Sequence, residues 1–257
     1  MNLAPMIRKT TSQPACETVH TIVKVLPGGG GFPSLVETAS GGRYVMKLSG
    51  VGQGATGLAT EFIATRLAAL LGLNVPAVTP LWLPEELPWQ AGTDEFYDAQ
   101  RRSSGWNLGV TFLDGAVDLT IKDLSAVPDA FLDRLAAVDA LLQNVDRTAK
   151  NLNLMRTPDG AHWAIDFGAC LLLQRWARRG GAGTCDLPPT HLLAGRAPAA
   201  LEVDAALAST SAIVAALPEP WVAALAADRA SLVKQIVDIL RHQTAGERCA
   251  SDTPLPD

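Results

Sequence analysis

The chain has 257 residues, enough for one large domain or for two lobes around a substantial hydrophobic core. Hydrophobic residues make up 48% of it and charged residues 18%, which is ordinary for a soluble enzyme. The net charge of −5 excludes a global positive field that would attract nucleic acid or acidic lipid, so we expect neither nucleic acid nor a membrane as a partner.

Targeting signals and metal-binding patterns are not found in the sequence. Residues 1–14 include Arg8 and Lys9 but no apolar run, so we expect no secretory signal. No segment reaches the roughly 18 continuous apolar residues of a membrane span. The four cysteines are scattered, without a C-x-x-C pair or a histidine at ligand spacing. These features predict free thiols in a cytoplasmic protein and no structural zinc.

The first elements in the chain are predicted to be strands. Alternating β-branched and polar residues indicate a strand at 18–26, and two more strands are predicted at 34–38 and 43–48. An amphipathic helix is predicted at 57–71, and Gly72 is a natural C-terminal stop for it. Together they predict a small antiparallel sheet followed by one helix.

Two more strands complete the predicted first half. Residues 75–83 are short and apolar, and residues 108–113 resume a strand pattern. The intervening segment, 84–106, is polar and rich in turn-forming residues, so we expect it to be a surface excursion.

The second half has a helical pattern. Helices are predicted at 129–143, 199–217 and 228–242, and short strands at 152–155 and 162–165.

The sequence therefore predicts an α+β fold with two lobes and a cleft between them. The expected N-lobe is an antiparallel sheet plus one helix at residues 1–115. The expected C-lobe is mainly helical and covers residues 116–243, and residues 244–257 are expected to be a loose tail.

The segment 144–151 and the D-F-G at 166–168 carry the strongest functional signal. Asp146 precedes Asn151 by five residues, and Asp166 follows twenty residues after Asp146. A phosphoryl-transfer site needs one carboxylate to orient the attacking group, and an amide and a second carboxylate to hold Mg²⁺. Each residue alone is better explained by a turn or a strand end, but the set at this spacing favours function.

A lysine and a glutamate upstream fit the same chemistry. Lys47 lies in a predicted strand, where a cation can contact phosphates, and Glu61 on the next helix is its natural counter-ion. The alternative is that both side chains are solvated surface charges.

Further nucleotide-binding candidates lie in loops. The glycine run 28–31 contains Gly29 and Gly30, whose backbone can approach phosphates closely, although a flexible hairpin tip explains the run equally well. Phe112 and Leu113, at the junction between the predicted lobes, are candidates for nucleotide contact.

Charged residues beside Asp146 have two interpretations. Arg147 and Lys150 could steady a transferring phosphoryl group, or they could be surface charges. The four histidines are dispersed and suggest neither a catalytic triad nor a metal site.

With these residues identified, the chain resembles the HipA-like kinases, a bacterial branch of the protein-kinase-like superfamily that is also related to phosphoinositide kinases. The resemblance covers about residues 23–173. Four pieces carry it: Tyr44-Val45-Met46-Lys47, Thr60-Glu61-Phe62-Ile63-Ala64 with Leu70 and Gly72-Leu73, Asn144-Val145-Asp146-Arg147 with Asn151, and Ile165-Asp166-Phe167-Gly168.

The resemblance implies a bilobal protein-kinase-like fold and a role for each site residue. Lys47 would contact the phosphates of ATP, and Glu61 would position Lys47. Asp146 would be catalytic, while Asn151 and Asp166 would bind Mg²⁺. The best-known members of the family phosphorylate a serine or threonine of a cytosolic protein.

We therefore expect an enzyme that uses ATP and Mg²⁺ to phosphorylate a protein serine or threonine. One alternative keeps the chemistry but makes the acceptor a small molecule, such as an antibiotic or a sugar. Another alternative is a non-catalytic nucleotide-binding module that holds a partner. This alternative predicts the loss of Lys47, Asp146 or Asp166, and all three residues are present.

Overall fold

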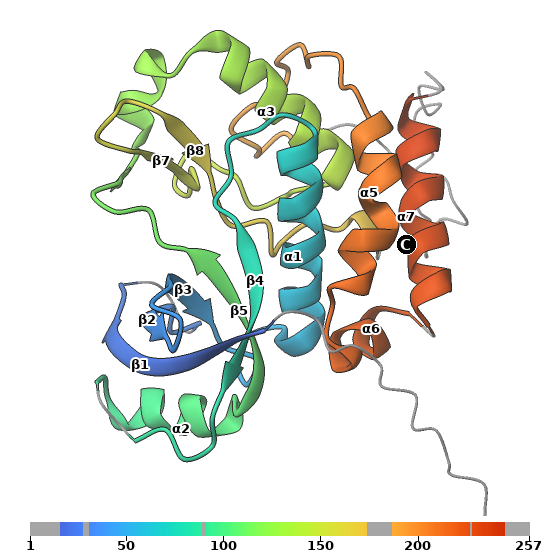
Figure 1. Ribbon diagram of the computed structural model, residues 1–257. Helices are drawn as coiled ribbons and strands as arrows, with labels where there is room; N and C mark the ends of the chain where they lie inside the picture. The colour runs from blue at the N-terminus through green and yellow to red at the C-terminus, as the bar shows by residue number, and fades with distance from the viewer. Residues whose placement is uncertain (1–15, 28–30, 89–90, 174–186, 227, 245–257) are drawn as a thin grey trace, which may run out of the picture.

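A computed structural model describes residues 16–27, 31–88, 91–173, 187–226 and 228–244. Five strands form a closed sheet at the lower left of Figure 1, in the order β1-β2-β3-β5-β4. These strands are β1 (Glu17–Val25), β2 (Ser34–Thr38), β3 (Arg43–Lys47), β4 (Val78–Leu83) and β5 (Gly105–Thr111). Each of them was predicted, with bounds that differ by a few residues.

The predicted antiparallel arrangement is wrong for one pair of neighbouring strands. Four pairs are antiparallel, but β1 and β4 are parallel, with Glu17 opposite Leu81 and Thr18 opposite Trp82. This fifth pairing closes the sheet, and closure removes the exposed edges that β1 and β4 would otherwise present. Strand periodicity says nothing about which distant strands become neighbours.

A short helix, α2 (Asp94–Arg102), lies against the closed sheet, below it in Figure 1. Phe96 and Ala99 on α2 are buried and join the apolar residues of the strands in one core. Thr93 caps this helix, because its hydroxyl accepts a hydrogen bond from the N–H of Phe96. The expectation that 84–106 is only a surface excursion is therefore wrong. A helix of nine residues with only two buried apolar positions gave too weak a helical pattern.

The helix α1 (Gly54–Leu70) is central to the structure. It begins three residues before the predicted start and ends where Gly72 was expected to stop it. Gly72 has φ +83°, and the N–H of the next residue, Leu73, donates to the carbonyl of Ala68 at 3.1 Å. This left-handed ending suits glycine, which has no Cβ to clash.

Three helices from the end of the chain accompany α1: α5 (Asp204–Ala215), α6 (Glu219–Leu225) and α7 (Arg229–Thr244). The helices α5 and α6 pack on α1, and their apolar residues share its core. Helix α6 was not predicted. Pro218 and Pro220 suggested a break, but proline is also common at the start of a helix, where its missing N–H costs nothing.

The middle of the chain holds a helix and a small second sheet of strand order β6-β7-β8. These elements are β6 (Val117–Asp118), the 3₁₀ helix η1 (Ile121–Ala126), α3 (Asp129–Leu142), β7 (Leu154–Arg156) and β8 (His162–Ala164). Strands β7 and β8 form the predicted hairpin, so the loop before β7 and the D-F-G after β8 leave the same end of it. None of the helices in the described ranges has both the length and the apolar character needed to cross a bilayer.

Candidate active site

Three charged side chains from distant parts of the sequence meet beside the closed sheet. Lys47 ends β3, Glu61 lies on α1, and Asp166 follows β8. The Nζ atom of Lys47 is 2.6 Å from Oε1 of Glu61 and 2.8 Å from Oδ1 of Asp166. The structure therefore brings these three predicted site residues into direct contact, as a group that we call the lysine cluster.

Burial and charge oppose each other in the lysine cluster. The side chain of Glu61 is only 4% exposed, and this burial raises the pKa of its carboxyl group although Lys47 partly offsets the effect. Burial alone would lower the pKa of Lys47, but Glu61 and Asp166 outweigh it and raise that pKa. Lys47 is therefore a cation at neutral pH, as a phosphate contact must be.

Asp166 is held in an uncommon backbone conformation. Its φ is +59°, in the left-handed region that residues other than glycine adopt rarely, and such residues cluster at functional sites. The side chain is 44% exposed and thus open to a ligand. Burial, the largest single effect, tends to raise the pKa of Asp166, but Lys47, the backbone of Gly168 and Arg147 together outweigh it and lower that pKa, so the group is ionised at neutral pH.

The last residue of the D-F-G has a close-packing role. A Cβ atom added at Gly168 would lie 3.2 Å from Oε2 of Glu61 and 3.5 Å from Oδ1 of Asp166. A larger side chain would press on both carboxylates, so glycine leaves room for the lysine cluster.

Asp146 and Asn151 form a second pair, in the loop between α3 and β7. The amide Nδ2 of Asn151 donates to Oδ2 of Asp146 at 2.8 Å. Thr148 and Asn151 also exchange backbone hydrogen bonds of 2.9 and 3.1 Å, which make the intervening turn tight. Asp146 is exposed, so its other oxygen is accessible.

Both interpretations of Arg147 are wrong, because its side chain is fully buried and contacts neither solvent nor an open site. Its Nε atom donates to Oδ2 of Asp139, on α3, at 2.6 Å. Its Nη1 atom donates to the carbonyls of Leu152 and Asn153, both at 2.8 Å. Lys150, in contrast, is exposed, as the surface interpretation predicts.

Sequence reasoning missed two residues beside Arg147. Asp139 is completely buried on α3, and Nε2 of His191 lies 3.3 Å from its Oδ2. The sequence signal that could have identified Asp139 is its position in the middle of an apolar helical stretch. A carboxylate that is buried there requires a charged or hydrogen-bonding partner. The position of His191 depends on how a distant segment packs, and no sequence pattern shows it.

The other predicted nucleotide contacts are Gly29, Gly30, Phe112 and Leu113. Gly29 and Gly30 lie outside the described residues. The N–H of Phe112 donates to the carbonyl of Arg43 at 3.0 Å, and its ring lies 4.8 Å from the guanidinium of Arg43. The carbonyl of Leu113 accepts from the N–H of Ala116. These contacts do not join Phe112 or Leu113 to the lysine cluster.

The donor atoms at the site fit Mg²⁺ better than a transition metal. Asn151 uses its amide nitrogen to bind Asp146, which leaves its oxygen as a ligand, and Asp166 has an exposed carboxylate. Mg²⁺ prefers oxygen ligands and is usually bound by one or two protein groups together with phosphates and water. Among the described residues, no group of three His, Cys, Asp or Glu side chains is arranged to hold a metal ion.

A lysine bound by two carboxylates, a D-F-G and an Asp–Asn loop on a mixed α+β fold are features of kinases. The model of the HipA-like kinase family matches residues 19–172, more than half of the chain, so the protein belongs to the HipA-like kinase family.

A solved structure supports the fold. The chain is similar to the Helicobacter pylori proinflammatory kinase CtkA, with a TM-score of 0.50 and 13% sequence identity. The similarity covers 91% of this chain and 99% of CtkA, and at this identity it shows a kinase-like fold alone. No protein with a curated description matches the chain.

Proposed function

We propose that this kinase transfers the γ-phosphoryl group of ATP to the hydroxyl group of a protein serine or threonine, with Mg²⁺ as its cofactor. The observation that carries the proposal is the contact of Lys47 with both Glu61 and Asp166. A cation held between two carboxylates from separate elements is positioned for a phosphate, and the second carboxylate is available for a metal ion.

The proposed reaction assigns one role to each group of the chain. Asp146 orients the acceptor hydroxyl and takes its proton through the oxygen that Asn151 does not occupy. The hydroxyl oxygen then forms a bond to the γ-phosphorus, and the bond from this phosphorus to the oxygen that bridges to the β-phosphate breaks. ADP leaves with that oxygen. Lys47 neutralises negative charge on the phosphates, and Glu61 keeps Lys47 in place.

Asn151 and Asp166 would hold Mg²⁺, which supplies charge neutralisation at the phosphates. We also propose that the nucleotide binds between an N-lobe at 1–115 and a C-lobe at 116–243. The site residues support this division, because Lys47 and Glu61 come from the first part and the other three from the second. A protein acceptor is favoured by the resemblance to kinases whose best-known members modify protein serine or threonine.

The test is transfer from γ-labelled ATP in the presence of Mg²⁺, with the wild type and the Asp146→Asn variant compared. Each is incubated alone and with bacterial lysate. Because Asp146 is exposed and isosteric with asparagine, the variant should fold normally. We expect a labelled protein band with the wild type and a loss of about 100-fold or more in the variant.

Three outcomes separate the alternatives. A labelled protein whose phosphate is on serine or threonine supports the proposal. Consumption of ATP without a labelled protein would instead indicate a small-molecule acceptor. Binding of ATP without any transfer, equal in the wild type and Asp146→Asn, would indicate a nucleotide-binding module and contradict the proposal.

A further inference from the structure

A buried polar group lies next to the loop that carries Asp146. Its centre is Asp139. The two carboxylate oxygens of Asp139 accept hydrogen bonds from Asn144 and Arg147, which lie on either side of Asp146 in the sequence. Asn144 donates through Nδ2 to Oδ1 at 3.0 Å, and Arg147 donates through Nε to Oδ2 at 2.6 Å. All three side chains are buried, with Arg147 and Asp139 at 0% exposure. We call these three residues and His191 the anchor cluster.

Arg147 reaches each predicted metal-binding segment. Its Nη1 atom binds the carbonyls of the two residues that directly follow Asn151, at 2.8 Å each. Its guanidinium also lies over the ring of Phe167, at 5.5 Å from the centroid, and Phe167 directly follows Asp166. One side chain therefore contacts the chain just after both Asn151 and Asp166.

Asn144 binds the backbone of Asp146 and is itself bound to Asp139. Its Oδ1 atom accepts a hydrogen bond from the N–H of Asp146 at 3.3 Å, while its own N–H donates to the carbonyl of Asp139 at 2.9 Å. The asparagine and the arginine of the N-x-D-R sequence are thus both tied to Asp139, and the catalytic candidate between them is the exposed residue.

The segment that follows residue 186 is attached to the same group. The N–H of Leu192 donates to the carbonyl of Arg147 at 2.8 Å. His191 accepts from the N–H of Leu193 through Nδ1, and this leaves Nε2 to face Asp139 at 3.3 Å. His191 therefore connects a third part of the chain to the anchor cluster.

We propose that Asp139 and Arg147 are positioning residues of the kinase reaction, which fix Asp146, Asn151 and Asp166 relative to one another through the buried guanidinium. This inference rests on the proposed function, because it assumes the catalytic and metal-binding roles of those three residues. Neither positioning residue touches a substrate.

Stability alone does not explain this arrangement. A buried ion pair can often be replaced by apolar side chains without loss of stability, because removing two charges from water is costly. Arginine offers what an apolar residue lacks, a rigid planar fork whose N–H groups point in fixed directions. Here the fork binds one carboxylate and two carbonyls, which defines the geometry of the loop.

The experiment compares Arg147→Lys with the double variant Asp139→Asn/Arg147→Met. Lysine keeps the charge but lacks the fork, and the double variant removes both buried charges so that neither is left unpaired. Leu240→Ala, a buried change on α7 away from the site, is the control for lost stability. For each variant we would measure the midpoint of urea unfolding and the amide hydrogen exchange at residues 144–153. We would also measure kcat and KM for ATP in the transfer of labelled phosphate from ATP to bacterial lysate.

We expect kcat of the double variant to fall by about 100-fold, the cost of misplacing catalytic groups by about 1 Å, even if its stability equals that of the wild type. Arg147→Lys should also lose kcat, with a much smaller change in KM. Exchange of the loop amides should increase in both variants, while Leu240→Ala loses stability but keeps kcat among folded molecules.

A double variant or an Arg147→Lys variant that folds and retains wild-type kcat and loop exchange would overturn the inference. If the double variant does not fold, Arg147→Lys alone decides. Loss of loop protection in variants of a protein that transfers no phosphate would support the anchoring while contradicting the proposed function, so the two failures are distinguishable.

Discussion

Lys47 and Glu61 lie on different elements, β3 and α1, yet Nζ of the lysine is 2.6 Å from Oε1 of the glutamate. The glutamate is almost inaccessible, while the lysine side chain retains 25% exposure and also contacts Asp166. A buried acid that binds a partly exposed base leaves the base positioned by the protein and reachable by a ligand.

We predict that this pair shows strong coupling in a double-mutant cycle. Lys47→Met leaves the Glu61 carboxylate buried without its cation, a change that typically costs about 3–5 kcal/mol for a broken buried pair. Because Lys47 is partly exposed, the loss should be at or below the lower end of that range. Glu61→Gln should cost less, since the amide oxygen can still accept from Lys47. The double variant should recover part of the stability lost in Lys47→Met.

Activity should not recover in the same way. Loss of a preorganised charge at the phosphates lowers turnover by about 10²–10³-fold, and Lys47→Met removes that charge in the single and the double variant alike. Urea unfolding and steady-state kinetics of the four proteins test this pattern. Recovery of turnover in the double variant would show that Lys47 serves folding and not phosphate binding.

Asp166 should be required for Mg²⁺-dependent binding of ATP, and asparagine is the informative replacement. Because φ at this position is +59°, alanine would add backbone strain, whereas asparagine tolerates the left-handed region. Asp166→Asn therefore removes the charge at the metal site and keeps the backbone conformation. We expect calorimetry to show no Mg²⁺-dependent affinity for ATP in this variant.

The control for this experiment is Asp98→Asn, an exposed acid on α2 that should leave affinity unchanged. Unchanged affinity in Asp166→Asn as well would refute the assignment of Asp166 to the metal.

Asp139 should contribute stability that disappears in acid. Burial tends to raise the pKa of its carboxyl group, but Arg147 and His191 outweigh burial and lower it below the usual range. A lowered folded-state pKa means that the contribution is fully present above the unfolded-state pKa of about 3.9 and is lost as the pH falls through the folded value. The charge on Asp139 is thus favoured throughout the neutral range.

The measurement is the free energy of unfolding of the wild type and Asp139→Asn between about pH 7 and about pH 3. The variant should be less stable at neutral pH, because Arg147 loses its counter-ion, and the difference should shrink below about pH 4. Asp166 titrates in both proteins, so its contribution to the free energy of unfolding cancels in the difference between them. A constant difference over the whole range would show that the charge of Asp139 is not what stabilises the fold.

Local sequence patterns predicted most elements and the main site because both depend on neighbouring residues. The strand at 34–38 and the helix start at Asp129 were located within a residue. The predicted site residues Lys47, Glu61 and Asp166 were named from motif and order, and the structure brings them together.

What the sequence could not supply were relationships between distant segments. The parallel pairing of β1 with β4 and the approach of His191 to Asp139 depend on the packing of the whole chain. Arg147 was misinterpreted for the same reason: a charge next to a candidate catalytic residue suggests a phosphate contact or a surface position, whereas the structure buries it against α3.

Trp221 should be important for the stability of α1, although it lies outside the region that matches the family. It is the largest fully buried side chain among the described residues and meets the ring of Phe62 edge-on, with centroids 6.3 Å apart. Phe62 directly follows Glu61, so Trp221 packs against the turn of α1 that carries the partner of Lys47. We expect Trp221→Ala to cost about 3–5 kcal/mol, as typical for a buried aromatic residue.

Trp82→Ala is a matched control, since Trp82 also meets another ring edge-on, that of Trp106, but is 41% exposed. Its replacement should cost clearly less in urea unfolding.

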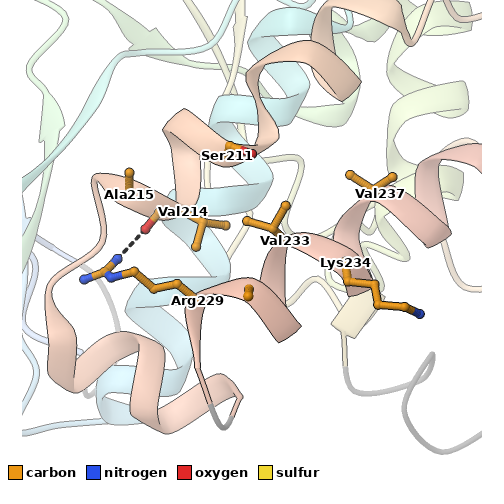
Figure 2. Close-up of a pocket in the computed structure, with 8 residues that line it drawn as sticks. Ser211, Val214, Ala215, Arg229, Val233, Lys234 and Val237 are labelled. Atoms are coloured by element: carbon orange, nitrogen blue, oxygen red, sulfur yellow. Dashed lines mark hydrogen bonds between the residues drawn. The ribbon is translucent and has the colours of Figure 1, made fainter.

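The contact between α5 and α7 offers a second comparison for the stability lost in Trp221→Ala. These helices line an open pocket of about 550 Å³ beside Val214 and Val233, where Arg229 donates to the carbonyl of Val214 (Figure 2). Val233→Ala removes two methyl groups from a site that is already open, so we expect a loss of stability well below that of Trp221→Ala. Equal losses in the two variants would mean that packing on α1 is no more important than packing between α5 and α7. A larger loss for Trp221→Ala, accompanied by a higher KM for ATP, would show that α6 supports the lysine cluster through α1.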